Sequence, residues 1–413
     1  MHQPWRATSL PLKVEYEPLS KHVLVAIPTE IWLEIIWQAC RIPGVDEFST
    51  DVAQHMDIYS IEGKPTANVT RLQLLIALER RLKMCFVCKG WASMAYRYLW
   101  SHLRIPLDGS SAILETLRLN PHLGPYVRRI TTVEQNLRLS VLLQDFEGDR
   151  NVLKEIISSC PHVVSIHMPV LNDRTLHALP QDIRNMNLFW QTTRTEFGLL
   201  PQTLTSLTLR LSHPSSSLDS PPRLELPNLR ALNIFQLTLF ESWVDTIVNH
   251  WDFPLLQILV LSGGTMTGPI RILQKFASTL QTVRIYGRLV PVQGQQSEPL
   301  SLPQLRRLDI MSTCEVSVFE KSMYLPSLGT VFIYWPYYQE IPFFDSEKDL
   351  SLNTFKRFLR ALHRWCPPSA TIMLEASEFV DWLLKQRAIT TIFKEVRDEG
   401  RRLVVLEQET SVM

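Results

Sequence analysis

The chain has 413 residues, of which 45% are hydrophobic and 20% are charged, so it can bury a large core and exceeds the size of one ordinary compact domain. Its 42 Lys and Arg residues nearly balance its 41 Asp and Glu residues, which leaves no bulk positive charge to attract phosphate backbones or anionic lipid. The composition therefore predicts one small and one large module, and it disfavours nucleic acid and membrane as partners.

The first segment, residues 1–22, mixes prolines and charges among its apolar positions. We expect this leader to be flexible, and it lacks the unbroken apolar run of a signal peptide. No later stretch has the length and apolarity of a membrane span. These features predict a cytoplasmic or nuclear protein, in which six scattered cysteines act as small apolar residues without disulfides.

A helix is predicted from Pro28, because proline suits the first turn of a helix, where its missing N–H costs nothing. Ile31 and Ile35 lie one turn apart on this helix, and Trp32 and Ile36 form the adjacent ridge. Almost the whole surface of the helix is therefore apolar. Such a helix must be covered on more than one side.

An insertion loop is predicted at about residues 41–70, where prolines and glycines interrupt the helical period. The helical pattern resumes at Arg71. We assign residues 23–105 to one small helical module that contains this loop.

The module resembles the F-box family in its motif residues, which are Ile27 to Ile31 in place of the family's Leu-Pro opening, Glu34 to Ile36, Leu82, Phe86 to Trp91, and Tyr98 to Trp100. The resemblance implies that the module binds a Skp-type adaptor, which in turn holds a cullin and its ubiquitin-transfer machinery. The adaptor-binding residues that it implies are Ile27, Pro28, Ile31, Trp32, Ile35, Ile36, Leu82, Val87, Cys88 and Trp91. The long insertion departs from the family's compact form.

Elementary packing also favours a docking role, because three short helices are too small to bury all of these apolar side chains by themselves. A competing interpretation is that the side chains pack on the downstream domain, and we expect Trp91 to be internal core. The spacing of Cys85 and Cys88 also suits a zinc or redox site, but no second pair at metal spacing exists. We therefore favour a packing role for both thiols.

From about residue 160, a triplet of aliphatic residues at i, i+3 and i+5 recurs at intervals that are typical of leucine-rich repeats. The triplets are Val163/Ile166/Met168, Ile183/Met186/Leu188, Leu204/Leu207/Leu209, Leu229/Leu232/Ile234, Leu256/Leu259/Leu261, Leu280/Val283/Ile285, Leu305/Leu308/Ile310 and Leu328/Val331/Ile333.

Prolines distinguish this pattern from a chance recurrence of aliphatic residues. A proline lies two positions before five of the eight triplets, at Pro161, Pro227, Pro254, Pro303 and Pro326. We expect each of these prolines to start a strand at its first position, where no ladder donor is lost. Each repeat would then be a strand plus a return segment, and it would bury its apolar side by stacking on its neighbours.

The fold class predicted is α/β, with the helical F-box-like module followed by an irregular leucine-rich-repeat solenoid over residues 106–336. Helical return segments are predicted at Phe240 to His250 and Ile270 to Phe276. Residues 104–150 are expected to hold a first, cap-like repeat.

Residues 337–413 are expected to close the repeats as a C-terminal cap. Its predicted elements are a helix from Thr354 to Trp365, a strand from Thr371 to Leu374, a second helix, and a strand from Leu403 to Leu406.

Positions between the aliphatic residues should point out of the strands and form a target-binding surface with Tyr and Arg anchors. The candidates are Arg284, Tyr286, Arg307, Asp309, Met311, Phe332 and Tyr334. The competing interpretation is that these positions carry no function. The paired arginines at 128–129 and 306–307 suit a phosphate mark, although such pairs are mostly solvated surface.

No catalytic constellation is present: the sequence lacks a glycine-rich phosphate loop, a Gly-x-Ser-x-Gly elbow and a His-Glu-x-x-His motif. We expect a non-catalytic protein without cofactor or metal, a substrate receptor that joins an unknown protein target to the adaptor. The alternative is a repeat scaffold whose helical module is only an N-terminal cap.

Overall fold

The structure is a computed structural model that describes residues 28–40, 79–106, 110–133, 149–168, 176–190, 197–211, 223–235, 238–239, 241–267, 269–290, 300–311, 323–334, 360, 366–375, 385, 387–398 and 402–406. These residues form a mixed α/β fold built on one large sheet of 13 strands. Every strand pair in the sheet is parallel.

The sheet comprises β1 (His102–Pro106), β2 (Arg129–Val133), β3 (Ser165–Met168), β4 (Asn185–Trp190), β5 (Ser206–Leu211), β7 (Ala231–Phe235), β8 (Thr238–Leu239), β10 (Ile258–Thr267), β11 (Thr282–Val290), β13 (Arg307–Met311), β15 (Thr330–Tyr334), β16 (Thr371–Glu375) and β17 (Arg402–Leu406). Two short pairs lie apart from it, β6 (Leu224–Glu225) with β9 (Trp251–Asp252), and β12 (Leu300–Ser301) with β14 (Met323–Tyr324).

The helices are α2 (Thr29–Cys40), α5 (Lys89–Trp100), α6 (Ser110–Leu119), α8 (Asp149–Ser158), α10 (Glu241–His250), α11 (Pro269–Lys275) and α14 (Arg387–Asp398), with 3-10 turns η2 (Pro121–Tyr126) and η3 (Phe197–Leu199).

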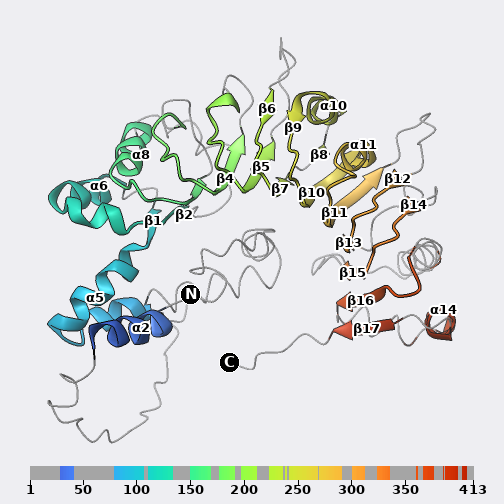
Figure 1. The fold of residues 1–413 in the computed structure, drawn as a ribbon, viewed down its shortest axis with the longest axis horizontal. Helices are drawn as coiled ribbons and strands as arrows, with labels where there is room; N and C mark the ends of the chain where they lie inside the picture. Colours follow the sequence, from blue (N-terminus) through green and yellow to red (C-terminus); the bar gives the residue numbers. More distant parts are fainter. Residues whose placement is uncertain are drawn as a thin grey trace, which may run out of the picture.

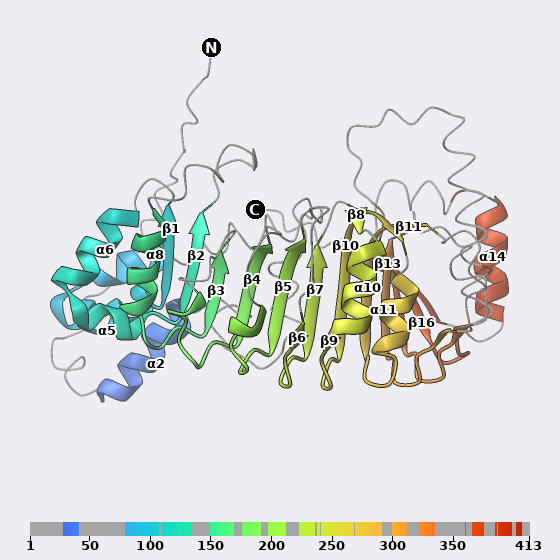
Figure 2. The ribbon, with the colours of Figure 1, turned by 90° about the horizontal axis from the view of Figure 1, so that it is seen from above.

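The sheet curves into an open arc that follows the order of the chain from β1 to β17 (Figure 1). Helices α6, α8, α10 and α11 lie on the outer side of the arc, and the strands line its inner side. Figure 2 shows the strands side by side and pointing the same way. The described strands do not close into a barrel, because β1 and β17 are the two ends of one path.

The aliphatic triplets account for eight of these strands, so the strand prediction is confirmed for β3, β4, β5, β7, β10, β11, β13 and β15. Their residues stand in register across the sheet: Leu259 pairs with Leu232 on one side and with Val283 on the other. These three side chains are fully buried. Rows of aliphatic side chains therefore face the outer helices and form the main core.

The five prolines lie in turns rather than at the first residue of a strand, which corrects the expectation. Each occupies the second position of a four-residue turn, and the first triplet residue is the fourth position. In one example, the N–H of Leu229 donates to the carbonyl of Leu226 at 3.2 Å, with Pro227 at the second position. Proline suits this position because its fixed φ matches the turn. The strand itself begins at Ala231.

Both ends of the sheet extend beyond the triplets. The strands expected at residues 371–374 and 403–406 are confirmed as β16 and β17, and the helical segments expected near residues 240–250 and 270–276 are confirmed as α10 and α11. The sheet begins at His102, so β1 straddles the expected module boundary after residue 105. The leader, the insertion at residues 41–70 and the helix expected at residues 354–365, apart from Arg360, lie outside the described residues.

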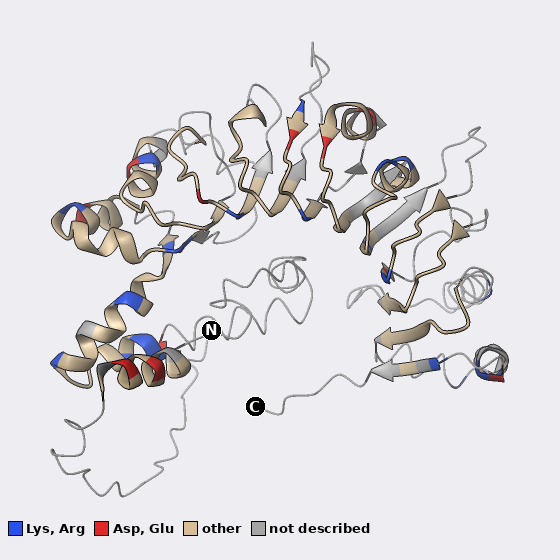
Figure 3. Ribbon diagram, viewed as in Figure 1, with Lys and Arg blue, Asp and Glu red and all other residues tan. Residues whose placement is uncertain are grey.

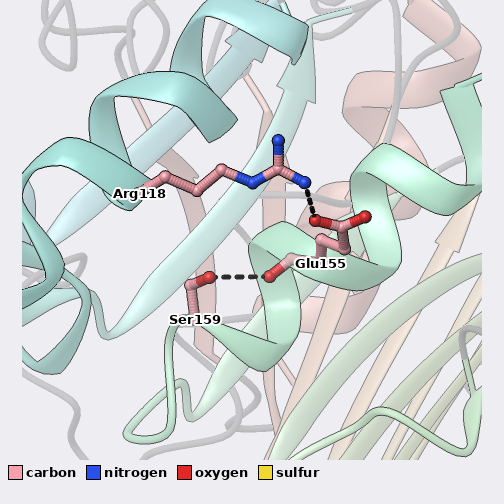
Figure 4. A network of polar contacts seen from close by, with 3 residues as sticks. All are labelled: Arg118, Glu155 and Ser159. Atoms are coloured by element: carbon pink, nitrogen blue, oxygen red, sulfur yellow. Dashed lines mark hydrogen bonds and ion pairs between the residues drawn. The ribbon is translucent and has the colours of Figure 1, made fainter.

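The outer layer at the β1 end is held by a close contact between η2 and the C-terminus of α8. A Cβ atom built on Gly124 would lie 1.9 Å from the carbonyl oxygen of Ser159, so only glycine fits there. Figure 4 shows the neighbouring polar network, in which Arg118 of α6 pairs with Glu155 of α8, and the Ser159 hydroxyl donates to the Glu155 carbonyl at 2.8 Å.

Candidate functional site

The N-terminal helices form a small core of their own, separate from the core of the sheet. Helix α2 packs on α5 through the indole rings of Trp32 and Trp91, whose centroids are 5.3 Å apart. Ile36 and Ala95 are fully buried at this contact. In Figure 1 the two helices cross below the β1 end of the arc. The core is minimal, because these are its only two fully buried apolar side chains among the described residues.

Polar contacts tie the helical residues 79–85 to the same core. Arg81 is 1% exposed, and its Nη1 donates to the carbonyl of Tyr98 at 3.3 Å. The Cys85 thiol donates to the carbonyl of Arg81 at 3.3 Å, and the Tyr98 hydroxyl donates to the carbonyl of Leu33 on α2 at 3.4 Å. Helix α2 and residues 79–85 are thus both fixed to α5.

Large apolar side chains remain exposed on this unit in two groups. The first group, which we term the α2 ridge, consists of Ile31 and Ile35, which are 50% and 42% exposed. The second, the turn group, consists of Leu82, Phe86 and Val87, which are 46%, 79% and 57% exposed. Exposed side chains of this size in two adjacent elements are typical of a surface that binds another protein.

The turn group precedes α5, whose first turn is capped by Cys88. The backbone N–H of Trp91 donates to the Cys88 sulfur at 3.4 Å, so this exposed thiol acts as a helix N-cap rather than as a packed apolar residue. Burial raises the pKa of the neighbouring Cys85 thiol. In the part of the chain that the structure describes, no group of three or more His, Cys, Asp or Glu side chains could hold a metal ion.

The sequence-predicted adaptor residues divide into exposed and internal sets. The exposed ones are Pro28, Ile31, Ile35, Leu82, Val87 and Cys88. Trp32 and Trp91 are half-buried against each other, which agrees with the expectation that Trp91 belongs to the core of the module. Ile27 lies outside the described residues. Ile36 was expected at the adaptor surface and is instead fully buried against α5, because it lies one residue around the helix from Ile35. The predicted adaptor residues omit Phe86, which belongs to the motif and is more exposed than any side chain of the α2 ridge or the rest of the turn group.

The expected target surface on the inner side of the sheet is more buried than the alternation of side chains predicts. Arg284 and Asp309 are 1% and 0% exposed, and Tyr286 is 5% exposed, which corrects the expectation that these three point into solvent. Arg284 and Asp309 face each other on β11 and β13, with Nε 3.1 Å from Oδ2. Asp309 also accepts from Nε of Arg307 at 2.7 Å. Neighbouring strands bring these long side chains together, so that they cover one another.

The other candidates of this surface lie beside that ion pair. The guanidinium of Arg307 lies 6.0 Å from the ring centroid of Phe332, which is half-buried. Met311 and Tyr334 are register partners on β13 and β15. The structure therefore brings the candidates of β11, β13 and β15 into one continuous stretch of sheet.

A basic cluster lies at the opposite end of the same inner side. His102 and Arg129 are buried register partners on β1 and β2, and a ring nitrogen of His102 lies 2.9 Å from the Thr131 hydroxyl. Burial and the neighbouring charge of Arg129 hold the pKa of His102 well below its usual range. This ring is therefore neutral at physiological pH.

No helix among the described residues has the length and apolarity needed to cross a membrane. Comparison with models of known protein families finds no match for this chain. Comparison with curated proteins finds no match either.

Proposed function

We propose that this chain is a substrate-receptor subunit of a cullin-type ubiquitin ligase, in which an F-box-like helical module docks on a Skp-type adaptor. The observation that carries the proposal is the exposure of the α2 ridge and the turn group on a unit whose own core is minimal. These groups contain the motif positions that resemble the F-box family. Such a receptor acts by raising the local concentration of its target beside a ubiquitin-loaded enzyme, so it needs no catalytic side chains of its own.

The energetics suit a docking role. Complete burial of an isoleucine or leucine side chain contributes about 1.5–3 kcal/mol, so covering a half-exposed one contributes on the order of 1 kcal/mol. The five side chains of the α2 ridge and the turn group would together contribute on the order of 5 kcal/mol of gross burial energy, against which the entropic cost of association is set.

We further propose that the curved sheet is an irregular leucine-rich-repeat solenoid that carries the target-binding surface. Support comes from the repeating unit itself: a turn with proline, a buried aliphatic residue, and a parallel strand with two more, in register with its neighbours. Such an arc offers a long inner face to a second protein.

Co-purification with a Skp-type adaptor tests the docking proposal. The full chain should retain the co-expressed adaptor, and replacing Ile31 and Val87 together by Lys should reduce the retained adaptor at least tenfold. Tyr324→Lys is the matched control, because Tyr324 is 63% exposed on β14, away from α2 and α5. Trp91→Ala is a weaker test, since it also removes the internal contact with Trp32. The proposal fails if the wild-type chain does not retain the adaptor, or if the double variant retains it fully.

A repeat scaffold capped by the helical module is the second candidate function, and the end of α5 favours it. Trp100 packs against the main core, and the carbonyl of Ser101 accepts the N–H groups of Arg128 and Arg129 at 2.9 and 3.0 Å. Deleting residues 1–100 separates the two functions while keeping β1. A folded remainder supports a detachable docking module, whereas an aggregated remainder supports a cap.

A further inference from the structure

A row of residues runs across the sheet at the edge where the strands begin. We term it the edge row, and its members are Arg128, Val164, Arg184, Thr205, Arg230, Gln257, Gln281, Arg306 and Gly329. The backbone N–H of each member after Arg128 donates to the carbonyl of the previous one at 2.8–2.9 Å, so the row is continuous. In Figure 2 this edge is the lower one, where the turns lie.

Arginine is strongly over-represented in the edge row. Its nine members include four arginines and no carboxylate, although the whole chain has a net charge of only +1. The next row, which contains Arg129, Ser165, Asn185, Ser206, Ala231, Ile258, Thr282, Arg307, Thr330, Thr371 and Arg402, also has no carboxylate. Figure 3 shows basic residues recurring along the arc of the strands. Asp182, in the turn before Arg184, is the acidic residue closest in sequence to any member of the edge row.

The four arginines of the edge row are solvent-exposed. Nη1 of Arg128 donates to the carbonyl of His162 at 3.3 Å. Within the described part of the chain, the side chains of Arg184, Arg230 and Arg306 make no hydrogen bond or ion pair. Four uncharged, half-buried residues separate these arginines, namely Val164, Thr205, Gln257 and Gln281. The edge therefore presents guanidinium groups every two or three strands, with uncharged side chains between them.

The spacing of these guanidinium groups matches an extended polypeptide. Neighbouring strands lie about 4.8 Å apart, and the arginines are separated by two, two and three strand steps, which gives intervals of about 10, 10 and 14 Å. A polyproline II segment is extended, advances about 3.1 Å per residue and completes a turn every three residues, so anionic groups three residues apart lie on one face at intervals of about 9 Å, close to the first two arginine intervals. Four to five residues of such a segment span the third interval of about 14 Å.

We propose that the edge row binds an extended, anionic segment of the target polypeptide, with phosphate or carboxylate groups paired to Arg128, Arg184, Arg230 and Arg306. Arginine is suited to both groups, because its planar guanidinium can donate two parallel hydrogen bonds to them. The proposal rests on the proposed function, since it names the class of target that the receptor would take. Nucleic acid is disfavoured because the chain is nearly neutral and the edge row contains no aromatic residue on which bases could stack.

Fluorescence anisotropy with three labelled 14-residue peptides tests this inference on the full chain. One peptide carries phosphoserine at positions 1, 4, 7 and 11, the second carries Glu and the third Ser at the same positions, in an otherwise identical Gly-rich sequence. We expect binding in the order phosphoserine, Glu, Ser, because a phosphate carries nearly two charges. This order also distinguishes a phosphate-dependent site from one that takes any acidic segment.

The triple variant Arg184→Gln/Arg230→Gln/Arg306→Gln should bind the phosphoserine peptide at least about tenfold more weakly at fixed ionic strength. The matched control, Lys154→Gln/Lys394→Gln/Arg397→Gln, removes three exposed positive charges from α8 and α14 and should bind within about twofold of the wild type. Equal binding by the triple variant and the wild type would overturn the inference, as would a wild-type chain that binds neither anionic peptide. Tighter binding of a single-stranded 12-nucleotide RNA would overturn the choice of a polypeptide.

Failure of this inference can be told apart from failure of the proposed function. The peptide measurement uses no adaptor, and the triple variant should still co-purify with the Skp-type adaptor because its substitutions lie outside the α2 ridge and the turn group.

Discussion

The indole rings of Trp32 and Trp91 lie 5.3 Å apart with their planes inclined at 54°. This contact joins α2 to α5 and turns the neighbouring Ile31 and Ile35 outward. The docking surface that we propose therefore depends on a contact between two helices of the module itself.

Trp32→Ala should loosen α2 from α5 while leaving the sheet intact. The variant removes a half-buried aromatic pair, so we expect the module to lose on the order of 2 kcal/mol. Hydrogen exchange of residues 29–40 and 89–100 should accelerate, and exchange of β10 and β11 should not change. Ile35→Ala is the control, since its side chain is 42% exposed. Unchanged exchange in α2 of the Trp32 variant would show that another contact holds the helix.

Gly124→Ala should destabilise the whole β1 end of the protein. Its Cβ would approach the Ser159 carbonyl carbon and oxygen to 3.0 and 1.9 Å, and backbone atoms cannot move aside as a flexible side chain can. We expect a loss of about 2–4 kcal/mol, measured as a lower urea midpoint. Gly198→Ala should change the midpoint little, because no atom lies within 4 Å of its added Cβ. Equal midpoints for the two variants would contradict the close contact.

Asp309→Ala should be among the most destabilising substitutions in the sheet. The carboxylate is fully buried and lies within 3.1 Å of both Arg284 Nε and Arg307 Nε. Removing one partner of a buried ion pair costs about 3–5 kcal/mol, because the other charge stays in a poorly solvated position. The double variant Arg284→Met/Asp309→Leu should recover much of the urea midpoint. If it is no more stable than Asp309→Ala alone, the buried pair does not account for the loss.

Acidification should weaken the fold through His102. The folded state holds the pKa of this group well below 6.5 through burial and the charges of Arg129, Arg81, Arg104 and His167, whereas the unfolded chain titrates near 6.5. Below that pH the unfolded state binds more protons, so the free energy of unfolding falls as the pH falls.

Between pH 7.5 and pH 5.5 this group should remove about 1 kcal/mol of stability. His102→Gln, which keeps a hydrogen-bonding group beside Thr131, should lose less stability than the wild type over the same interval. Urea midpoints at the two pH values measure the difference, and equal pH dependence of the two proteins would exclude His102 as the cause.

The sequence alone located most of the strands, because an aliphatic triplet is a local pattern with a direct physical meaning. A buried strand between outer helices and solvent needs apolar side chains at alternate positions, so Leu259 and Leu261 predict β10 without knowledge of its neighbours. The same reasoning found β16, β17, α10 and α11. The resemblance to the F-box family predicts that Ile31 and Val87 lie on the surface, and both side chains are exposed.

The tertiary structure decided which of these side chains meet solvent and which meet each other. Ile35 and Ile36 are consecutive and chemically identical, yet one is exposed and the other fully buried, because only the position of α5 distinguishes the two sides of α2. Arg284 and Asp309 are 25 positions apart and become an ion pair because β11 and β13 pair in one particular register. Arg184 and Arg230 belong to no sequence motif, and strand pairing places them in one basic edge with Arg306. The burial of a side chain and the clustering of charges depend on distances between helices and strands. A sequence pattern shows only the spacing of apolar residues within one helix or strand, so it cannot determine those distances.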